Sequence, residues 1–364
     1  MAKRAIPLVA ALGLLALMAA PVAAHDNGDR GHHRGENEYV VTTLVSNGGV
    51  PAVRTDANLV NGWGLAALPT SPWWVANNGT DTSTLYDGTG APKPLVVTVT
   101  GGPTGLVANT TTDFSVSGGG VSGVARFIFA TEAGTILGWS PTVPAASSTV
   151  TEVGADRSPV GAIYKGLATG SVNGANYLYA TDFHNGRVDV FNGTFALQAW
   201  GNAFRDPRLP HGYAPFGIQN LNGTIFVTFA KQDADKKDEI AGRGRGIVSA
   251  FSPAGKFLGR VASRGALNAP WGLAWAPADF GRFSGDLLVG NFGNGKINAY
   301  AMTKHGWRFA GTLRGEHHQA ITIDGLWALG FGNGTGSGPL NSLYFTAGPN
   351  EESNGAFGSI VVGD

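Results

Sequence analysis

The chain has 364 residues, with 25 basic and 25 acidic side chains, 56 glycines and no cysteine. A balanced charge without a basic stripe excludes a protein built to bind nucleic acid, and the lack of cysteine excludes disulfides and cysteine-ligated metal sites. Glycine is at about twice its usual share. Together with many Val, Thr, Phe and Trp residues and no long helical periodicity, this composition predicts an all-β fold with many tight turns.

Residues 1–24 have the features of a secretory signal peptide. Lys3 and Arg4 precede an apolar run over residues 6–20, and Val22 and Ala24 fit the −3 and −1 positions of a signal peptidase site. The alternative is an uncleaved membrane anchor, for which the apolar run is short. We therefore predict export, to the extracellular space or the periplasm, after cleavage near Ala24. The mature chain is expected to contain no membrane span.

Residues 25–38 read "HDNGDRGHHRGENE" and contain no apolar side chain. A segment of this composition cannot bury enough surface to fold, so we predict a disordered polar leader. The remaining residues, 39–364, are predicted to form a single domain.

A short pattern recurs six times along that domain. A Gly-Leu or Gly-Ile pair is followed by a loop, an apolar strand such as "NYLYATD", and a second strand such as "GRVDVFNG". Each unit of roughly 50 residues fits a four-stranded antiparallel meander, and six such units around an axis form a six-bladed β-propeller. The six pairs begin at Gly64, Gly105, Gly166, Gly217, Gly272 and Gly325.

The last unit contains only three strands, whereas "EYVVTTLVSN" at residues 38–47 precedes the first unit without a partner. We predict that residues 39–46 complete the last blade and close the ring. This arrangement places Val41 beside the strand at residues 360–362. Because ring closure removes the open sheet edges, the propeller is also expected to be a monomer.

The stretches "NGWGLAALP" at residues 61–69 and "APWGLAWAP" at residues 269–277 are predicted to be inner strands of two blades. Alternate residues of a strand share a face. Trp271 and Leu273 should therefore fill the gap to one neighbouring blade. Gly272 and Ala274 should allow the other neighbour to approach closely.

The six units resemble NHL-repeat propellers and the wider strictosidine-synthase and gluconolactonase-like group. More narrowly, "TTLVSN", "NLVNGWGLA" and "AKQDADKKDEIAG" resemble an uncharacterised family of exported bacterial propellers, which often carry PEP-CTERM sorting tails. The resemblance covers about residues 39–364. It implies the fold and leaves the function open, because that family has no established activity.

Propeller geometry predicts where a ligand would bind. In the usual blade the inner strand begins, and the second strand ends, at the top face, and the residues at these positions are the most polar of each unit. We predict that a small molecule, a glycan or a protein partner binds at this face, over the central channel. The candidate ligand-binding residues are Asn61, Asn77, Lys165, His184, His211, Lys231, Asp233, Asn294 and Trp327.

The resemblance to gluconolactonase-like propellers implies an alternative, a metal-dependent hydrolase or lactonase with a divalent cation in the channel. Carboxylate and amide oxygens suit Ca²⁺ or another hard cation. The chain departs from that pattern, since Asn61 stands where the family has a glutamate. A cation without a catalytic role and a water-filled channel are the other interpretations. The candidate metal ligands are Asp182, Asn291, Asp324 and Glu132.

Covalent catalysis receives no support from the sequence. No serine lies in a nucleophile elbow, and there is no cysteine. His184, close to Asp182, fits either a general base or an ordinary loop.

The run "KQDADKKDEIAGRGRG" at residues 231–246 is a dense cluster of charge in the fourth unit. We predict that it extends the top-face loop of that blade and covers the channel mouth. It fits a solvated rim, a loop that recognises a partner, or a calcium loop. The calcium pattern is incomplete, because Lys237 occupies a ligand position and the required glycine is absent.

Overall fold

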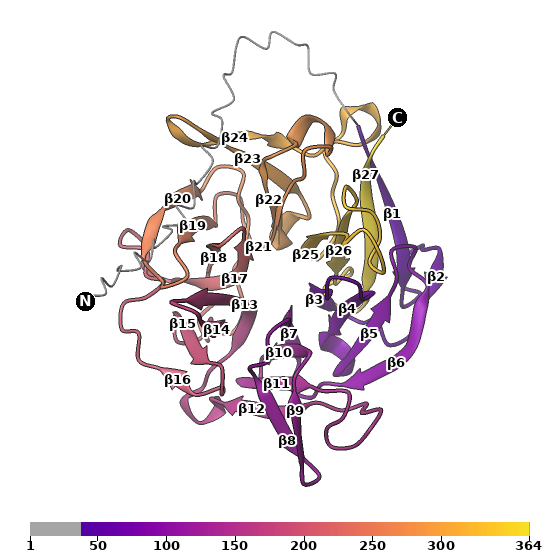
Figure 1. Cartoon of the computed structure of the whole chain (residues 1–364). Coiled ribbons are helices and arrows are strands. Elements are labelled where there is room, and N and C mark those ends of the chain that lie inside the picture. The colour runs from indigo at the N-terminus through magenta and orange to yellow at the C-terminus, as the bar shows by residue number, and fades with distance from the viewer. Residues whose placement is uncertain (1–37, 364) are drawn as a thin grey trace, which may run out of the picture. The chain divides into compact units, whose positions relative to one another are not determined.

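The computed structural model describes residues 38–363, which belong to one compact unit. The predicted signal peptide and nearly all of the polar leader lie outside these residues. Within the unit, six β-sheets follow one another in chain order around a ring, with the inner strand of each sheet at the centre (Figure 1). Each inner strand contacts the inner strands of the two neighbouring sheets. The predicted six-bladed β-propeller is confirmed.

The blades are four-stranded antiparallel sheets, listed here from the inner to the outer strand. Blade 1 contains β3 (Gly62–Ala66), β4 (Trp73–Asn77), β5 (Thr82–Tyr86) and β6 (Pro92–Thr98), and blade 2 contains β7 (Pro103–Ala108), β10 (Phe127–Thr131), β11 (Thr135–Trp139) and β12 (Glu152–Asp156). Blade 3 contains β13 (Tyr164–Val172), β14 (Ala175–Asp182), β15 (Arg187–Asn192) and β16 (Leu197–Gln198), and blade 4 contains β17 (Tyr213–Leu221), β18 (Thr224–Lys231), β19 (Ile247–Phe251) and β20 (Phe257–Ser263). Blade 5 contains β21 (Pro270–Trp275), β22 (Leu287–Asn291), β23 (Ile297–Thr303) and β24 (Gly306–Thr312), and blade 6 contains β25 (Leu326–Phe331), β26 (Leu343–Ala347), β27 (Ala356–Val362) and β1 (Tyr39–Ser46).

Several short 3₁₀ turns and one hairpin lie outside the blade strands. The 3₁₀ turns are η1 (Asn78–Thr80), η2 (Ser158–Val160), η3 (Gly281–Phe283), η4 (Phe292–Asn294) and η5 (Glu316–His318). None of the helical segments in residues 38–363 is long and apolar enough to cross a membrane. One element that the sequence did not reveal is a hairpin of β8 (Ser115–Gly118) and β9 (Val121–Val124), inserted between the two innermost strands of blade 2.

The N-terminal strand closes the ring as predicted. β1 pairs antiparallel with β27 and is the outer strand of blade 6, with Val41 opposite Ile360. A two-residue strand, β2 (Arg54–Thr55), pairs parallel with the end of β1. The first and last parts of the described chain therefore share one sheet, which leaves no blade with a missing strand.

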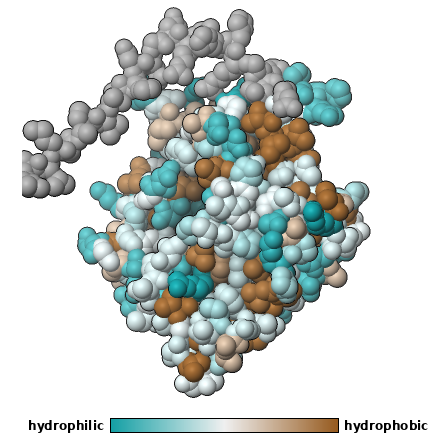
Figure 2. Space-filling model, turned by 45° about the vertical axis from the view of Figure 1, so that its right-hand side comes forward, coloured by the Kyte–Doolittle hydropathy of each residue, from teal (hydrophilic) through white to brown (hydrophobic). Residues whose placement is uncertain are grey.

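Local sequence explains the turns and the interior. Asn173 and Asn222 have φ values of 51° and 53° and form the β13–β14 and β17–β18 turns, where an Asn-Gly pair supplies the positive φ that a tight hairpin needs. Apolar side chains fill the space between blades, as Tyr179, Val227 and Phe251 do between blades 3 and 4. On the outside, apolar residues lie in small areas among polar ones (Figure 2).

The glycines of the repeat allow neighbouring blades to approach closely. A Cβ atom on Gly217 would lie 2.2 Å from the carbonyl oxygen of Trp271, and one on Gly272 would lie 2.4 Å from that of Trp327. Real Cβ atoms do not approach backbone oxygens so closely, so only glycine fits without a shift. The predicted small face of the inner strands is confirmed.

The prediction for the large face was wrong for Trp271. The pairing of β21 with β22 has a register shift between Pro270 and Leu273, and inner strands of the other blades have similar irregularities. This bulge breaks the simple alternation of faces. Leu273 packs among residues between blades, whereas Trp271 packs against Trp63 and Trp327 at the centre of the ring.

The structure also corrects the alignment of the sixth repeat. Leu329 pairs with Phe345 in the way that Leu273 pairs with Val289. The equivalent of Gly272 is therefore Ala328, three residues after the Gly325 that the sequence pattern suggested. Trp327 consequently occupies the same position as Trp271.

Candidate functional site

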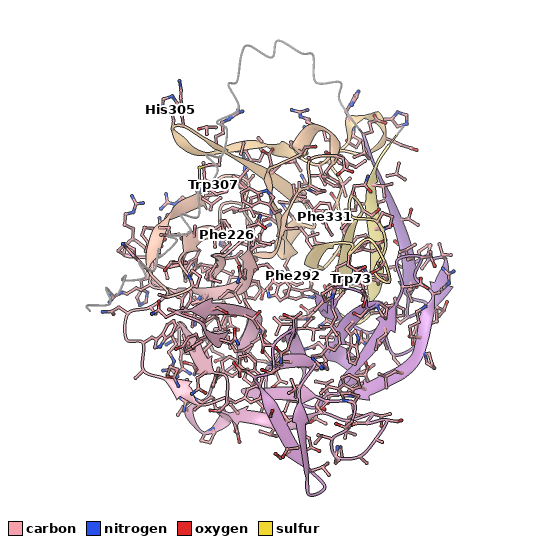
Figure 3. All side chains as sticks on the ribbon, in the orientation of Figure 1. Trp73, Phe226, Phe292, His305, Trp307 and Phe331 are labelled. Atoms are coloured by element: carbon pink, nitrogen blue, oxygen red, sulfur yellow. The ribbon has the colours of Figure 1, made fainter. Side chains whose placement is uncertain are left out.

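The centre of the ring is filled by aromatic side chains at the level where the inner strands begin. Trp63 stacks on Trp327 with ring centroids 3.6 Å apart, and Trp271 meets both rings edge-on. Phe216 lies 5.9 Å from Trp327, and Phe292 stacks on the same ring at 4.0 Å near the middle of the ring of blades (Figure 3). We call these five residues the aromatic plug. An apolar layer therefore lies across the centre of the ring at this level.

A buried lysine lies directly on the plug. Lys165, at the start of β13, is 1% exposed, and its Nζ lies 5.0 Å from the centroid of the Trp63 ring. Its ammonium donates to Glu132 Oε1 at 2.5 Å and to Asp238 Oδ1 at 3.1 Å. An ammonium over an indole face is stabilised by the ring quadrupole, and the two carboxylates balance its charge.

Two amides connect this lysine to further acids. Asn61 Nδ2 donates to Glu352 Oε2 at 2.8 Å and to Asn78 Oδ1 at 3.3 Å, and Asn78 Nδ2 donates to Glu132 Oε2 at 3.1 Å. The indole N–H of Trp327 donates to Asn61 Oδ1 at 3.0 Å. One hydrogen-bond network thus joins the plug, through two amides of blade 1, to Glu132 of blade 2 and Glu352 of blade 6.

Acidic side chains outnumber the cations here, although Lys237 as well as Lys165 acts electrostatically on Glu132. Glu132, Asp238, Glu239 and Glu352 all influence Lys165 electrostatically, or are influenced by it. We call these four carboxylates and Lys165 the acidic cluster. When all four acids are ionised, the cluster carries excess negative charge next to an apolar layer, where charge is poorly solvated.

The pKa values in the cluster reflect this excess. Burial raises the pKa of the Glu132 carboxyl, but Lys165 and Asn78 outweigh burial and hold that pKa below its usual value. Burial raises the pKa of Glu239 to about 8, and Lys165 offsets only part of that effect. Burial also raises the pKa of Glu352, with repulsion from Glu132 and Asp238 adding to it. The lysine therefore neutralises Glu132 but does not neutralise Glu239 and Glu352.

A pocket of about 360 Å³ opens beside the cluster at the top face. Its walls are Phe292 from the plug, the carboxylates of Asp324, Glu351 and Glu352, Ala241 from the charged loop, and backbone at Gly293, Gly325 and Gly348. We call it the acidic pocket. Glu352 belongs to both the pocket and the cluster, so a group bound in the pocket would affect the ionisation of the cluster.

The charged loop at residues 231–246 contacts blade 3. Gln232 Nε2 donates to the carbonyl of Phe183 at 2.6 Å, and Asp238 reaches Lys165. Asp233 accepts the backbone N–H of Lys237 at 2.9 Å, which makes a local turn. Through Asp238 and Glu239 the loop adds two acids to the cluster, as expected for a segment at the channel mouth.

The structure brings together only part of the predicted ligand-binding set. Asn61, Lys165 and Trp327 belong to the network above the plug. Asn77 is fully buried and donates to Thr82 and Thr84 within its own blade, and Asn294 accepts from Asn291. His184 has a buried Nδ1 without a hydrogen bond, His211 is exposed, and Lys231 is partly buried.

The four predicted metal ligands lie in separate settings. Glu132 pairs with Lys165, and Asp182 accepts bonds from Asn185 and the backbone of Ile163. Asn291 donates to the carbonyl of Ala266, and Asp324 accepts the backbone N–H of Asn350. Within residues 38–363 no group of three or more His, Asp or Glu side chains has the arrangement of a metal site. Each of the four therefore bonds to a different partner, and the metal site stays a prediction.

The repeat itself explains why polar residues looked like ligands. Asn77, Thr131, Asp182 and Asn291 end the second strand of their blades and pair with the first residue of the inner strand. Their side chains bond to nearby turn atoms. The recurring polarity at this position is thus largely structural. Sequence analysis missed Glu239 and Glu352 as members of a site, and the only signal for Glu239 was the charged run around it.

Comparison with known proteins agrees with the fold. No protein-family model matches the chain. A protein of unknown function from Bacteroides thetaiotaomicron has a TM-score of 0.57 at 11% identity, covering 90% of this chain and 77% of that one. A streptogramin B lyase structure has a TM-score of 0.52 at 13% identity, covering 91% and 100%. The soluble aldose sugar dehydrogenase of Escherichia coli has a TM-score of 0.52 at 15% identity, covering 89% and 100%.

At these identities the likeness to solved structures shows the fold alone, which is the class of six-bladed β-propellers. The chain is 32% identical to Uncharacterized protein R648 of Acanthamoeba polyphaga mimivirus over 344 residues, which are 91% of this chain and 82% of that protein. It is 30% identical to Uncharacterized protein L690 of the same virus over 342 residues, 91% and 88%. The chain belongs to the family of these uncharacterised proteins. The predicted propeller family is thus supported at the level of the fold, but the relatives are viral proteins and not the bacterial ones that the motifs suggested.

Proposed function

We propose that this protein is a ligand-binding propeller whose top face takes a small molecule with a cationic group in the acidic pocket. The observation that carries the proposal is the charge of the acidic cluster, in which Lys165 pairs with Glu132 and Asp238 and acts at longer range on Glu239 and Glu352. Lys237 adds a second positive charge that acts on Glu132, so the carboxylates still outnumber the cations. A bound cation would supply the missing positive charge, and it would do so where a carboxylate is poorly solvated and interacts strongly.

The pocket wall supports the same class of ligand. The residues that line the cavity include the aromatic Phe292 and three acidic residues, Asp324, Glu351 and Glu352. Aromatic faces and carboxylates both attract ammonium and guanidinium groups. The volume of about 360 Å³ suits a small molecule.

Ionisation of the cluster gives the proposal a pH dependence. Glu239 has its pKa raised to about 8, and that of Glu352 is also raised. Protonation of these acids removes the charge that a cation would bind. The affinity for a cation should therefore rise as the pH increases from 6 to 8.5.

The test is calorimetric titration of the full mature chain with tetramethylammonium, whose charge does not change with pH, and with putrescine. The uncharged tert-butanol, of similar shape to tetramethylammonium, is the control ligand. Glu352→Gln and Asp324→Asn should each weaken binding about tenfold, the loss of one charge-assisted contact. Asp279→Asn, an exposed aspartate without a hydrogen-bonded side chain in the described structure, is the matched control.

The proposal is wrong if neither cation binds at pH 8.5, if tert-butanol binds equally well, or if Glu352→Gln binds both cations like the unchanged protein. Export remains part of the proposal, because the signal peptide lies outside the described residues. N-terminal sequencing of protein recovered from the culture medium or periplasm should begin near His25. Protein retained with Met1 would contradict export.

A further inference from the structure

A cavity lies at the opposite end of the channel from the acidic cluster. It has a volume of about 440 Å³ and is lined by the C-terminal halves of all six inner strands, with Trp73 added from β4. We call it the lower cavity. It has no role in the function proposed for the top face.

The aromatic plug separates the two ends of the channel. Between the plug and the lower cavity is a gap of about 20 Å³, lined by Trp271, Gln219 and inner-strand leucines. A space of that size holds about one water molecule. The plug and this small gap therefore separate the lower cavity from the acidic cluster.

The wall of the lower cavity carries no ionisable side chain. On one side it is lined by Trp73, Trp275 and Phe331, of which Trp73 and Phe331 are labelled in Figure 3, together with Leu273 and Leu329. A charged ligand would lose its hydration there without gaining a counter-charge. The cavity is therefore suited to an uncharged ligand.

The other side of the wall is lined by hydrogen-bonding groups from blades 3 and 4. The amides of Gln219 and Asn222 and the hydroxyl of Thr169 line the cavity, and in the described structure none of these groups makes a hydrogen bond. Asn220 is held in place by donating to the carbonyl of Thr169 at 2.8 Å and accepting from Gly223. Gln219 is an exposed residue that lines both the lower cavity and the small gap below the plug.

We propose that the lower cavity binds an uncharged saccharide. A sugar ring has an apolar C–H face, which can pack on the aromatic wall, and a rim of hydroxyls, which can exchange hydrogen bonds with amide and hydroxyl groups. The lining combines amides without hydrogen bonds, an opposite aromatic wall and no ionisable group. This combination fits a neutral sugar better than an anion, a cation or a purely apolar molecule.

An adjoining groove favours a saccharide of more than one ring. The groove has a volume of about 360 Å³ and shares Ala108, Thr169 and Asn220 with the lower cavity. Its lining adds Asn109, Thr110, Thr111, Ser171 and Asn176. A second ring could lie in this groove while the first occupies the cavity.

The variants for the test exploit two equivalent hairpin turns. Asn222 lines the cavity at the β17–β18 turn, and Asn173 forms the same turn in blade 3 without lining it. Asn222→Gly removes the amide and keeps the positive φ, while Asn173→Gly makes the same change away from the cavity. Gln219→Ala removes an amide from an exposed position of the cavity lining, where a folding defect is not expected.

The experiment titrates the full mature chain with glucose, galactose, maltose, cellobiose and chitobiose, followed by calorimetry and tryptophan fluorescence. Glucosamine and glucuronate are the charged controls. At least one neutral sugar should bind more tightly than both controls, and Gln219→Ala and Asn222→Gly should each weaken it about fivefold, the loss of one uncharged hydrogen bond. Asn173→Gly and the top-face variant Glu352→Gln should bind it normally.

The inference is overturned if none of the neutral sugars binds at millimolar concentration, if a charged control binds as well, or if Asn222→Gly and Asn173→Gly behave alike. Because Glu352→Gln is included, the two proposals are tested separately. If the cation proposal is wrong, the sugar titrations can still be interpreted, and if the sugar proposal is wrong, the cation titrations can still be interpreted.

Discussion

Replacing Lys165 by methionine is the sharpest test of the electrostatic argument. Methionine keeps much of the apolar stem of lysine but removes the ammonium that pairs with Glu132 and Asp238. Removing one partner of a buried ion pair costs about 3–5 kcal/mol. We expect about 3 kcal/mol, the low end, because Glu132 is 24% and Asp238 56% exposed and water can partly solvate both acids.

The loss should depend on pH in a defined direction. In the unchanged protein the pKa of Glu132 is held low, so its pairing stabilises the fold above the ordinary carboxyl pKa and is lost on acidification. Without Lys165 burial dominates and Glu132 becomes protonated more readily. Lys165→Met should therefore be less destabilising at pH 5 than at pH 8.

Urea denaturation followed by tryptophan fluorescence at both pH values measures the effect. Lys256→Met, which changes an exposed lysine without a hydrogen-bonded side chain, should alter stability by no more than about 0.5 kcal/mol. Adding Glu132→Gln to Lys165→Met should recover part of the loss, because the unpaired acid is then absent. A loss below about 0.5 kcal/mol at pH 8, or an equal loss at both pH values, would refute the reasoning.

Three further outcomes are expected. Glu239→Gln should change the free energy of unfolding little at pH 5 and raise it increasingly towards pH 8.5. The reason is that the raised pKa of Glu239 makes the folded state lose stability as this acid ionises. Urea titrations that give the same stability difference at every pH would contradict this. Gly217→Ala should cost more than about 1 kcal/mol in the same assay, since the new Cβ would lie 2.2 Å from Trp271 O, whereas Gly315→Ala, with 3.2 Å to its nearest atom, should cost less; equal costs would argue against tight blade packing. A chain that begins at residue 48 lacks β1 and should aggregate through the exposed edge of β27, while one that begins at residue 38 should remain monomeric in light scattering; equal behaviour would contradict ring closure by β1.

The sequence was sufficient for the architecture, and the reason is repetition. A single Gly-Leu strand start is ambiguous, but six similar units give six independent indications of the same meander. The unpaired segment at residues 39–46 was identified for the same reason, since a unit with three strands shows what it lacks. The pairing of Val41 with Ile360 follows directly.

The sequence was a poorer guide to the site, because side chains with the same polarity serve different roles. Asp182 and Asn291 end their strands in the same position, and each bonds to an asparagine three residues further on, although their types suggested metal ligands. Glu239 and Glu352 lie 113 residues apart in the chain numbering, and no local pattern relates them. Both carboxyls interact electrostatically with Lys165. They do so only because the charged loop of blade 4 and the β26–β27 loop of blade 6 meet above the plug.

The amino-acid order by itself determined the number of blades, the strand that closes them and the glycines that let them touch, because these depend on short-range periodicity and on turn chemistry. The tertiary structure alone decided that Trp271 turns to the axis, through a bulge that strand periodicity does not reveal. It also decided that the channel is divided into an acidic upper end and an uncharged lower one. The charge balance of the cluster and the lining of the cavities depend on which residues, distant in the sequence, lie close together in space. Only the closed ring determines these neighbours.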